Sequence, residues 1–319
     1  MDVMDAIARS PGGLVVGGAP DGHDAQLAAA AARARGGVVL HVARDDAQAS
    51  AFIATVRFFD PGLDVLRLPA WDCLPYDRVS PGLEVAAARL AALSRLARRA
   101  ASKDPLLVVT TGSALAQRCP PRDVIAAASF DARPGEILDQ GRFSAYLAAN
   151  GYARAATVRE PGDYAIRGGV IDVFAPGQDE PVRLDLFGDQ LESIRAFDPE
   201  TQRSTRQIKA ISLAPVSEAL LDDASVARFR RGWLERFGAG QGDPLYETVS
   251  AKARRQGVEH WLALFYDRLD TLLDYAGPDA QILHDSQALS AASERSETAR
   301  DHIEARKAAA DPRNAPPRH

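Results

Sequence analysis

Short apolar runs and alanine-rich amphipathic stretches alternate along the first 118 residues. The runs GLVVGG, GVVLHVA, LDVLRLP and PLLVVTTG have the length of strands. The segments HDAQLAAAAARAR, DDAQASAFIATVRFF and LEVAAARLAALSRLARR have the spacing of helices. Strands that alternate with helices typically form a parallel sheet covered by helices. The pattern therefore predicts an α/β fold that begins with a strand at residues 13–18.

The alternation ends between Pro120 and about Pro215. A short helix in FSAYLAANGYAR is followed by short strands, and from Val182 to Phe187 apolar and polar side chains alternate. The two faces of this strand carry Val182, Leu184 and Leu186 on one side and Arg183, Asp185 and Phe187 on the other. Gly188-Asp189 fits a two-residue hairpin turn. These signals predict a compact α+β segment with a small antiparallel sheet.

One face of that strand has the composition of an interaction surface. The aliphatic side is expected in the core, which leaves Arg183, Asp185 and Phe187 on the other face, with Arg167 entering from an Arg-Gly-Gly turn. An aromatic ring beside arginines is typical of an interface anchor. An alternative is that Phe187 covers a neighbouring loop and that the charges are merely solvated. The pattern alone does not decide between them.

After Pro215 the chain is predicted to be helical. SVARFRRGWLERFG and EHWLALFYDRLDTLLDYAG both have apolar residues spaced for one buried face. We expect Trp233, Phe237, Trp261 and Phe265 in a core rather than as platforms for nucleic-acid bases. From Ser286 onward large apolar residues are scarce, which predicts a polar helix and then a disordered end.

Composition adds limits to this picture. A chain of 319 residues with 46% apolar and 25% charged residues is long enough for two domains with real cores. Its net charge of -5 argues against a surface built wholly for nucleic acid. No apolar run has membrane length, and the start lacks the pattern of a signal peptide. We therefore expect a cytoplasmic protein without membrane contact.

The cysteines and histidines give no pattern for a metal. Cys73 and Cys119 belong to no CxxC pair, and the six histidines lack the spacing of ligands. We expect two buried thiols, no metal site and no cofactor.

The segment that begins the first predicted helix has the glycine spacing of a phosphate-binding loop. Gly17 and Gly22 match the glycines of G-x-x-x-x-G-K-[ST], but His23 and Asp24 stand where lysine and a hydroxyl residue are needed. A histidine that is mostly neutral and a carboxylate do not replace the charge and the magnesium ligand. The sequence indicates a degenerate nucleotide loop. The alternative, an ordinary strand–turn–helix that never bound nucleotide, predicts the same inactivity.

Several blocks of the sequence resemble one family. RGGVIDVF, RLDLFGDQLESIRAFDPETQRS, AISLAPVSE and the upstream LPAWDCLPYDRVSPGLEVAAARLAAL are similar, in order and spacing, to the amino-terminal region of the bacterial transcription-repair coupling factor, Mfd. That region is built like the excision-repair protein UvrB. The resemblance extends from about Gly13 to about Asp285.

The resemblance implies a RecA/helicase-like, degenerate nucleotide-binding domain with a small inserted α+β domain. We expect residues 1–125 to form the first part of the α/β domain, 126–215 the inserted domain, 216–290 the second part, and 291–319 a polar helical or disordered tail. The strand AQILHD would return to the first sheet. Asp285 stands at the first acidic position of the nucleotide site, and Ser286 replaces the glutamate that would handle the attacking water.

For function, the resemblance implies a non-catalytic adaptor that recruits UvrA to stalled transcription complexes in nucleotide excision repair. Arg167 matches the arginine of the family's RG turn, and Arg183 and Phe187 match the ends of its RLDxF strand. Asp185 is expected either to meet a basic group of UvrA or to orient Arg183.

The full-length family is an ATP-dependent DNA translocase that also contacts RNA polymerase and double-stranded DNA. Nothing in this chain resembles the polymerase-contacting module or the motor, so we expect a fragment, a truncated form or a motorless relative, and no enzyme activity.

An alternative function is that of a DNA-binding module in a UvrB-like, helicase-related repair protein. It would use the arginines of LSRLARRA and predicts duplex binding that weakens with salt. Trp71 and Tyr76 are aromatic enough to stack on bases, but their proline-rich surroundings favour packing against the sheet edge. No long aromatic-rich insertion follows LPYD, so direct recognition of DNA damage is not expected.

Overall fold

The computed structural model describes residues 13–18, 20, 22–75, 77, 79–99, 102–240 and 242–308. These residues form two compact units. The first holds the described residues up to Ala70 together with Arg98–Arg118 and Asp270–Asp301, and the second holds Trp71–Ala97, Cys119–Leu269 and the described residues from His302. The predicted α/β class is confirmed, since the chain has a parallel sheet and further sheets.

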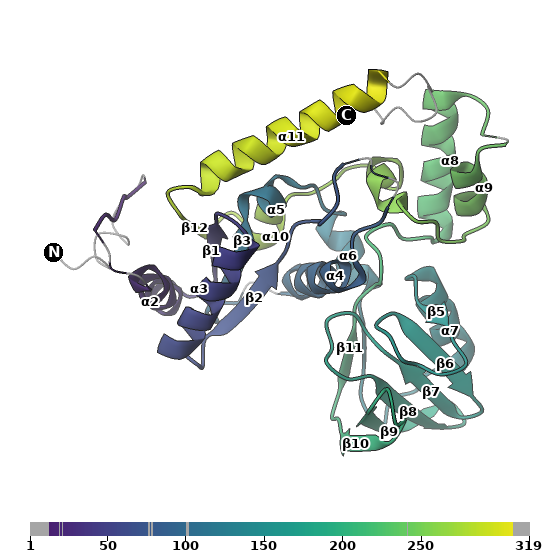
Figure 1. Cartoon of the computed structure of the whole chain (residues 1–319). Coiled ribbons are helices and arrows are strands. Elements are labelled where there is room, and N and C mark those ends of the chain that lie inside the picture. The colour runs from purple at the N-terminus through teal and green to yellow at the C-terminus, as the bar shows by residue number, and fades with distance from the viewer. Residues whose placement is uncertain are drawn as a thin grey trace. The chain divides into compact units, whose positions relative to one another are not determined.

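A four-stranded parallel sheet is the centre of the first unit. Its order is β12-β1-β3-β2 (Figure 1), and all three pairings are parallel. The strands are β1 (Val38–Ala43), β2 (Asp64–Leu68), β3 (Leu106–Thr111) and β12 (Gln281–His284). Every residue of β3 is buried, as expected for a strand covered on both faces. The expected return of AQILHD to this sheet is confirmed by the pairing of β12 with β1.

The helices of the first unit are α2 (His23–Arg35), α3 (Asp46–Phe59), α5 (Gly112–Ala116), α10 (Leu272–Ala276) and α11 (Ala288–Ala308). Of these, α2, α3 and α11 follow predicted helical segments. Alanines on α2 pack with Phe52, Ile53 and Val56 of α3 in one core cluster. The Asp45 side chain caps α3 by accepting a hydrogen bond from the Gln48 amide. Small side chains on α2 thus let the two helices approach each other closely.

The predicted first strand is wrong. Residues 13–17 have neither helix nor strand, and the side chain of Val15 is 93% exposed. The apolar run is only three residues long and lies between glycines, which lose more conformational entropy than other residues when they are held extended. The described residues directly before the candidate nucleotide loop therefore form no strand.

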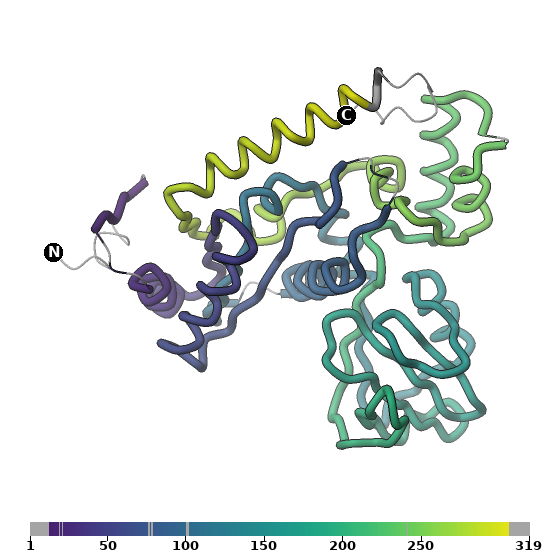
Figure 2. The backbone as a smooth tube through the Cα atoms, viewed as in Figure 1, coloured from purple at the N-terminus to yellow at the C-terminus, as the bar shows by residue number. Residues whose placement is uncertain are grey.

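The second unit contains a six-stranded sheet in the order β10-β9-β8-β7-β6-β5. Its strands are β5 (Ala153–Arg154), β6 (Asp163–Arg167), β7 (Val170–Val173), β8 (Val182–Phe187), β9 (Gln190–Phe197) and β10 (Ser204–Gln207). All pairings are antiparallel except that of β5 with β6. The predicted antiparallel sheet is confirmed, and the teal part of the trace follows it strand by strand (Figure 2).

Helix α7 (Gln140–Ala149) and a two-stranded sheet of β4 (Phe130–Ala132) and β11 (Ile211–Leu213) complete this part. Phe143 and Leu147 of α7 share a core with Ile171, Leu184 and inward residues of the other strands. One face of the six-stranded sheet is therefore committed to packing, and the other face carries the candidate site.

The second unit also contains a mainly helical part. Its elements are α4 (Leu83–Arg98), α6 (Arg122–Ala128), α8 (Asp223–Phe237), α9 (Pro244–Ser250) and a 3-10 helix η1 (Val258–Leu264). Trp233 and Phe265 are buried, and Phe237 and Trp261 pack against the same cluster. The prediction that these four aromatic residues belong to a core is confirmed.

The segment EHWLALFYDRLDTLLDYAG does not form the single amphipathic run that its spacing indicates. It divides into η1 and α10, with Trp261 in a non-helical conformation. Thr271 then begins α10 with a capping box, in which its hydroxyl accepts from the Asp274 amide and the Asp274 carboxylate accepts from the Thr271 amide. The cap starts a new helix where the periodicity predicts continuation.

The compact units divide the chain differently from the predicted domains. Residues 216–269 cluster with the second unit, whereas 270–301 cluster with the first. The predicted polar helix after Ser286 is confirmed as α11, and residues 309–319 lie outside the described residues. A side chain at Gly112 would place its Cβ 2.6 Å from that of Ala292, so α11 begins in close contact with α5.

Candidate functional site

Alternation along β8 produces the predicted outer face. Val182 and Leu184 are buried, whereas Phe187 is exposed, and Arg183 and Asp185 are intermediate. Cross-strand pairing extends this face, because Arg183 lies between Asp172 on β7 and Arg195 on β9, and Asp185 lies between Val170 and Ser193. Paired residues point to the same side of a sheet. We call this side of β6–β9 the outer face.

The hairpin that ends β8 is the predicted one. Phe187 pairs with Gln190 across Gly188-Asp189, and Gly188 has φ 59°. A register shift after Asp185 gives β9 one extra residue, Glu192, because Asp185 pairs with Ser193 and Leu186 with Leu191. The bulge lets Leu191 remain in the core and keeps Phe187 on the outer face. Sequence alternation alone does not reveal it.

The Arg-Gly-Gly turn joins β6 to β7 and has a steric reason for both glycines. Arg167 pairs with Val170, and Gly168 has φ 59°, which favours glycine. An added Cβ at Gly169 would lie 2.6 Å from the carbonyl oxygen of Leu186. That carbonyl belongs to β8, and the Leu186 amide donates to the Gly169 carbonyl at 2.7 Å. The turn therefore holds Arg167 close to the end of β8.

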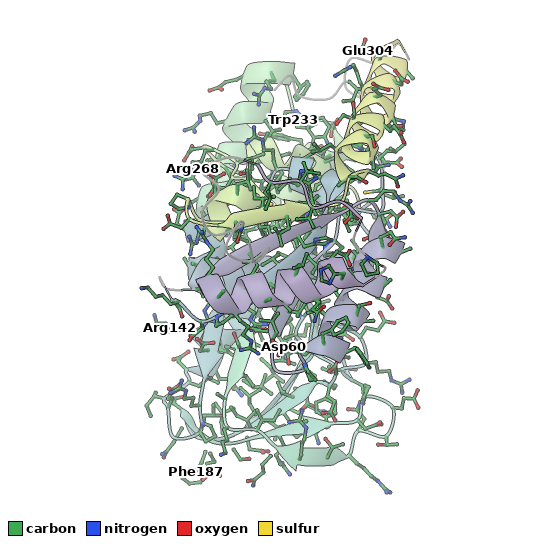
Figure 3. The ribbon with its side chains drawn as sticks, turned by 90° about the vertical axis from the view of Figure 1, so that its left-hand side faces the viewer. Asp60, Arg142, Phe187, Trp233, Arg268 and Glu304 are labelled. Atoms are coloured by element: carbon green, nitrogen blue, oxygen red, sulfur yellow. The ribbon has the colours of Figure 1, made fainter. Side chains whose placement is uncertain are left out.

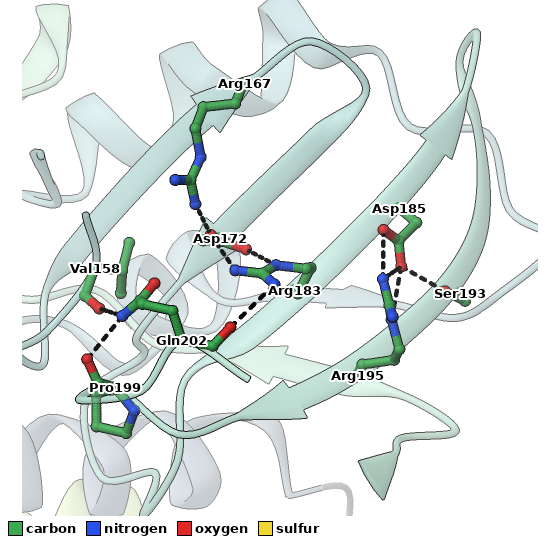
Figure 4. Close-up of polar contacts among 9 residues, drawn as sticks. All are labelled: Val158, Arg167, Asp172, Arg183, Asp185, Ser193, Arg195, Pro199 and Gln202. Atoms are coloured by element: carbon green, nitrogen blue, oxygen red, sulfur yellow. Dashed lines mark hydrogen bonds and ion pairs between the residues drawn. The ribbon is translucent and has the colours of Figure 1, made fainter. Parts of the chain in front are cut away.

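Asp172 is the centre of an ion-pair group on the outer face (Figure 4). Its carboxylate is fully buried and accepts from Arg183 through Nε at 2.7 Å and Nη2 at 2.9 Å. Arg167 donates to the same carboxylate from the other side. One buried anion thus orients both arginines that the sequence selected, although Asp172 itself was not among the predicted residues.

Arg183 is held more firmly than a free surface arginine. Its guanidinium stacks over the Phe197 ring at 4.8 Å and donates to the Gln202 carbonyl at 3.4 Å. The hydrogen bonds to Asp172 raise the pKa of Arg183, and burial, which acts in the opposite direction, does not cancel the rise. The side chain is 18% exposed, against 52% for Arg167. Arg167 is therefore the more accessible positive charge.

Asp185 pairs with a residue that the sequence did not indicate. It accepts from Arg195 through Nε at 3.0 Å and Nη2 at 2.9 Å, and from the Ser193 hydroxyl at 2.6 Å. The expectation offered Arg183 or a partner residue as its contact. The structure places Asp185 with Arg195, because Arg195 pairs with Arg183 on β8 and so lies diagonally across from Asp185 on the same face.

Phe187 projects away from the ribbon at the end of β8 (Figure 3). Its side chain is 76% exposed, so it does not lie under a neighbouring loop of the described chain. The face consequently joins an exposed aromatic ring to three arginines and two aspartates that are paired with one another. Such a surface suits a partner with an apolar pocket and an acidic group.

Two contributors to this face, Asp172 and Arg195, were missed from the sequence. Both lie opposite Arg183 in the strand register, one on each neighbouring strand. Only the strand pairing identifies these two residues, and that pairing depends on the turn lengths and, for Arg195, on the bulge. Reading β8 alone selects its own side chains but not its neighbours.

The candidate nucleotide loop has a different character. Gly22 has φ 82° and precedes α2 without a side-chain cap, and the Asp24 carboxylate accepts from the Ala25 amide at 2.8 Å. The His23 ring contacts Gln26 at 3.2 Å within the same turn. Gly17 has no regular secondary structure, and two residues of the loop, 19 and 21, lie outside the described residues.

Asp285 follows β12, and its carboxylate contacts residues in and directly after the neighbouring strand β1. It contacts His41 Nε2 at 3.3 Å and accepts from the Arg44 amide at 3.0 Å. Partial burial acts to raise the pKa of Asp285, but the hydrogen bonds from His41 and the Arg44 amide outweigh it and leave the pKa below 3.8. The contacts of Asp285 are thus with His41 of β1 and with Arg44, which follows β1, whereas the contacts of His23 and Asp24 are within the first turn of α2.

Trp71 is committed to packing. Its indole donates to Glu218 Oε1 at 2.9 Å, and the buried Arg89 donates to the same oxygen at 2.6 Å. Trp71 therefore packs within the second unit, where its ring also lies edge-on to His260, and packing against the sheet edge stays a prediction. Tyr76 lies outside the described residues. In the arginine-rich run behind the DNA-binding alternative, Arg99 donates to backbone carbonyls of Ser102 and Asp104.

The two cysteines are buried thiols that are not joined in a disulfide, as predicted. Burial raises the pKa of Cys73 to about 11, so its thiol is protonated at neutral pH. In the part of the chain that the structure describes, no group of three or more His, Cys, Asp or Glu side chains is arranged to hold a metal ion. None of the helices in that part combines the length and apolar character that a membrane crossing requires.

Comparison with known proteins identifies relatives for this arrangement. Residues 130–218, which contain the outer face, match the UvrB interaction domain family. The transcription-repair-coupling factor of Haemophilus influenzae is 35% identical over 214 residues, which cover 66% of this chain and 18% of the relative. The coupling factor of Escherichia coli is 33% identical over 214 residues, again 66% of this chain and 18% of the relative.

A third coupling factor, from Myxococcus xanthus, is 34% identical over 262 residues, or 76% of this chain and 21% of the relative. The chain therefore spans about a fifth of the length of these curated relatives.

Proposed function

This chain belongs to the transcription-repair-coupling factor family and contains a UvrB interaction domain at residues 130–218, and we propose that it is a non-catalytic adaptor that recruits UvrA to stalled transcription complexes. The outer face of β6–β9 binds UvrA, the damage-sensing ATPase of nucleotide excision repair. In a coupling factor, other segments contact RNA polymerase and double-stranded DNA. The protein acts in the cytoplasm.

The exposure of Phe187 is the observation that supports this function best. The ring lies within the matched segment, is 76% exposed, and stands beside the charged rows of the outer face. Exposed aromatic side chains beside arginine are enriched among the few residues that dominate binding energy. Phe187 supplies the anchor that loses water when UvrA binds.

The charged residues divide into two roles. Arg167, which is half exposed, faces an acidic group of UvrA and steers its approach. Arg183 is mostly covered and holds Asp172, which in turn orients Arg167. Asp185 and Arg195 form a second pair that fixes the surface next to Phe187.

The first unit, in this proposal, is a helicase-like domain that has lost its nucleotide chemistry, and the second sheet is an insertion into it. Asp24 brings a negative charge to the start of α2, and His41 and the Arg44 amide already engage Asp285. Neither group is free to hold magnesium or phosphate without breaking an internal contact. A magnesium-ATPase assay on the purified chain, expected to give no turnover above a protein-free blank, tests this part.

A titration of the chain against purified UvrA tests the adaptor function. Phe187→Ala is expected to lose about 2–4 kcal/mol of binding free energy, or roughly 30- to 1000-fold in Kd, because a buried aromatic anchor is removed. Phe58→Ala is the matched control, since Phe58 is a phenylalanine of similar exposure, 80%, in the first unit. Circular dichroism and urea unfolding should be the same for both variants.

Two results would contradict the proposal. One is an absence of UvrA binding by the parent chain at micromolar concentrations. The other is binding that survives Phe187→Ala, or that Phe58→Ala weakens equally, because either outcome would place the interface elsewhere.

A further inference from the structure

Only two large apolar side chains are exposed among the described residues of the matched segment 130–218. They are Ile137 and Phe187, and each is 76% exposed. Single exposed apolar residues are common on protein surfaces. Two of them are informative only if they lie together, and the strand register shows that they do.

Gln190 connects the two side chains. It pairs with Phe187 across the hairpin and with Ile137 on its other side, through a bridge outside the named strands. Residues that pair laterally point to the same face of a sheet, and neighbouring strands lie about 4.8 Å apart. Phe187 on β8, Gln190 on β9 and the bridged residue Ile137 therefore form one row about 10 Å wide. We call these three residues the hairpin stripe.

The backbone fixes Ile137 in this position. The Leu138 amide donates to the Asp189 carbonyl at 2.7 Å, and the Leu191 amide donates to the Glu136 carbonyl at 3.0 Å. Leu138 is buried in the core of the second unit, so its neighbour Ile137 is turned outward. The exposure of Ile137 is thus a property of a paired strand segment.

We propose that the hairpin stripe is one continuous docking surface for UvrA and that Ile137 is a second apolar anchor beside Phe187. The inference rests on the proposed function and makes it more specific. The partner surface must offer an apolar groove long enough to cover both side chains, a polar group for the Gln190 amide between them, and an acidic group near Arg167.

Continuity with the matched interaction domain favours UvrA as the occupant. The stripe is the next outward row after Arg167, Val170, Asp185 and Ser193, and it lies inside residues 130–218. A second copy of the chain is the alternative occupant, and the sedimentation measurement below distinguishes the two.

A titration with fluorescently labelled UvrA tests the stripe in the full chain. Ile137→Ala is expected to weaken binding about tenfold, and Ile137→Asp more strongly, because a carboxylate would be buried in an apolar groove. Ile282→Ala is the control, since Ile282 is 46% exposed on β12 in the first sheet, and it should bind like the parent. Phe187→Ala is measured in parallel, with urea unfolding of every variant.

The four variants separate the possible outcomes. A loss with Ile137→Ala and Phe187→Ala, but not with Ile282→Ala, supports the stripe. A loss with Phe187→Ala while both Ile137 variants stay within twofold of the parent overturns the second anchor and leaves the adaptor function intact. If the parent does not bind UvrA, both proposals fail. Concentration-dependent dimerisation that Ile137→Asp abolishes, seen by sedimentation, would assign the stripe to self-association and overturn it.

Discussion

The carboxyl edge of the first sheet and the outer face of the second sheet both carry charged side chains, but on the second two apolar side chains, each 76% exposed, lie in one row beside the charges. At the first sheet, Asp285 is engaged by His41 and the Arg44 amide. At the second, Asp172 and Asp185 are engaged by arginines in a similar way, and Phe187 and Ile137 remain exposed beside them.

This difference indicates which groups are available to a partner. A charged group with its hydrogen bonds already made gains little from a new ligand, because old contacts must break first. An exposed apolar side chain loses no contact and gains from leaving water. The ion pairs of the second sheet therefore shape the surface, and its apolar residues supply most of the binding energy.

The largest expected effect on stability is at Asp172. Asp172→Ala should reduce the free energy of unfolding by about 2–4 kcal/mol, because it leaves the mostly covered Arg183 without its buried anion. Asp179→Ala, at an exposed loop position, should change it by less than about 0.5 kcal/mol. Urea unfolding followed by circular dichroism makes the comparison. Equal stability of the two variants would mean that the ion pairs do not shape the outer face.

A smaller effect distinguishes the two glycines of the Arg167 turn. Gly169→Ala should cost about 1–3 kcal/mol, because its Cβ would lie 2.6 Å from the Leu186 carbonyl oxygen. Gly168→Ala should cost about 1 kcal/mol, since it has open space and only a positive φ to accommodate. The same unfolding measurement ranks them. A reversed order would contradict the close approach of the turn to β8.

The smallest effect concerns the first sheet and depends on pH. The pKa of Asp285 is lowered in the folded chain, so its ionised form stabilises the fold above the ordinary aspartate value of 3.8, and this contribution is lost as the pH falls below that value. Asp285→Asn should therefore cost about 1 kcal/mol at pH 7 and progressively less below pH 4. Denaturant titrations at pH 7, 5 and 3.5 check this. A cost that grows in acid would contradict the described contacts of Asp285.

Much of the fold follows from local patterns. Alternation predicts β8 and its two faces, and Gly168-Gly169 and Gly188-Asp189 predict the two hairpin turns. Sequence patterns mispredict an element when its formation depends on a pairing strand or on a helix cap. Residues 13–18 have strand-like composition without a paired neighbour, and Thr271 interrupts an otherwise helical periodicity.

The candidate site was predicted in part for the same reason. Arg167, Arg183, Asp185 and Phe187 follow from one strand and one turn, whereas Asp172, Arg195 and Ile137 join them through pairing with neighbouring segments. For Arg195 that pairing also depends on the bulge at Glu192. The sequence also does not show how much of the Arg183 side chain is exposed. Those properties arise only when the strands are assembled.

Hydroxyl-radical footprinting of the chain, alone and saturated with UvrA, tests the location of the interface most directly. Phe187 and Phe58 are exposed to similar extents in the free chain and react through the same ring chemistry. The account predicts that UvrA protects Phe187 and Ile137 and leaves the modification rate of Phe58 unchanged. Protection of Phe58 with Phe187 still fully reactive would contradict it.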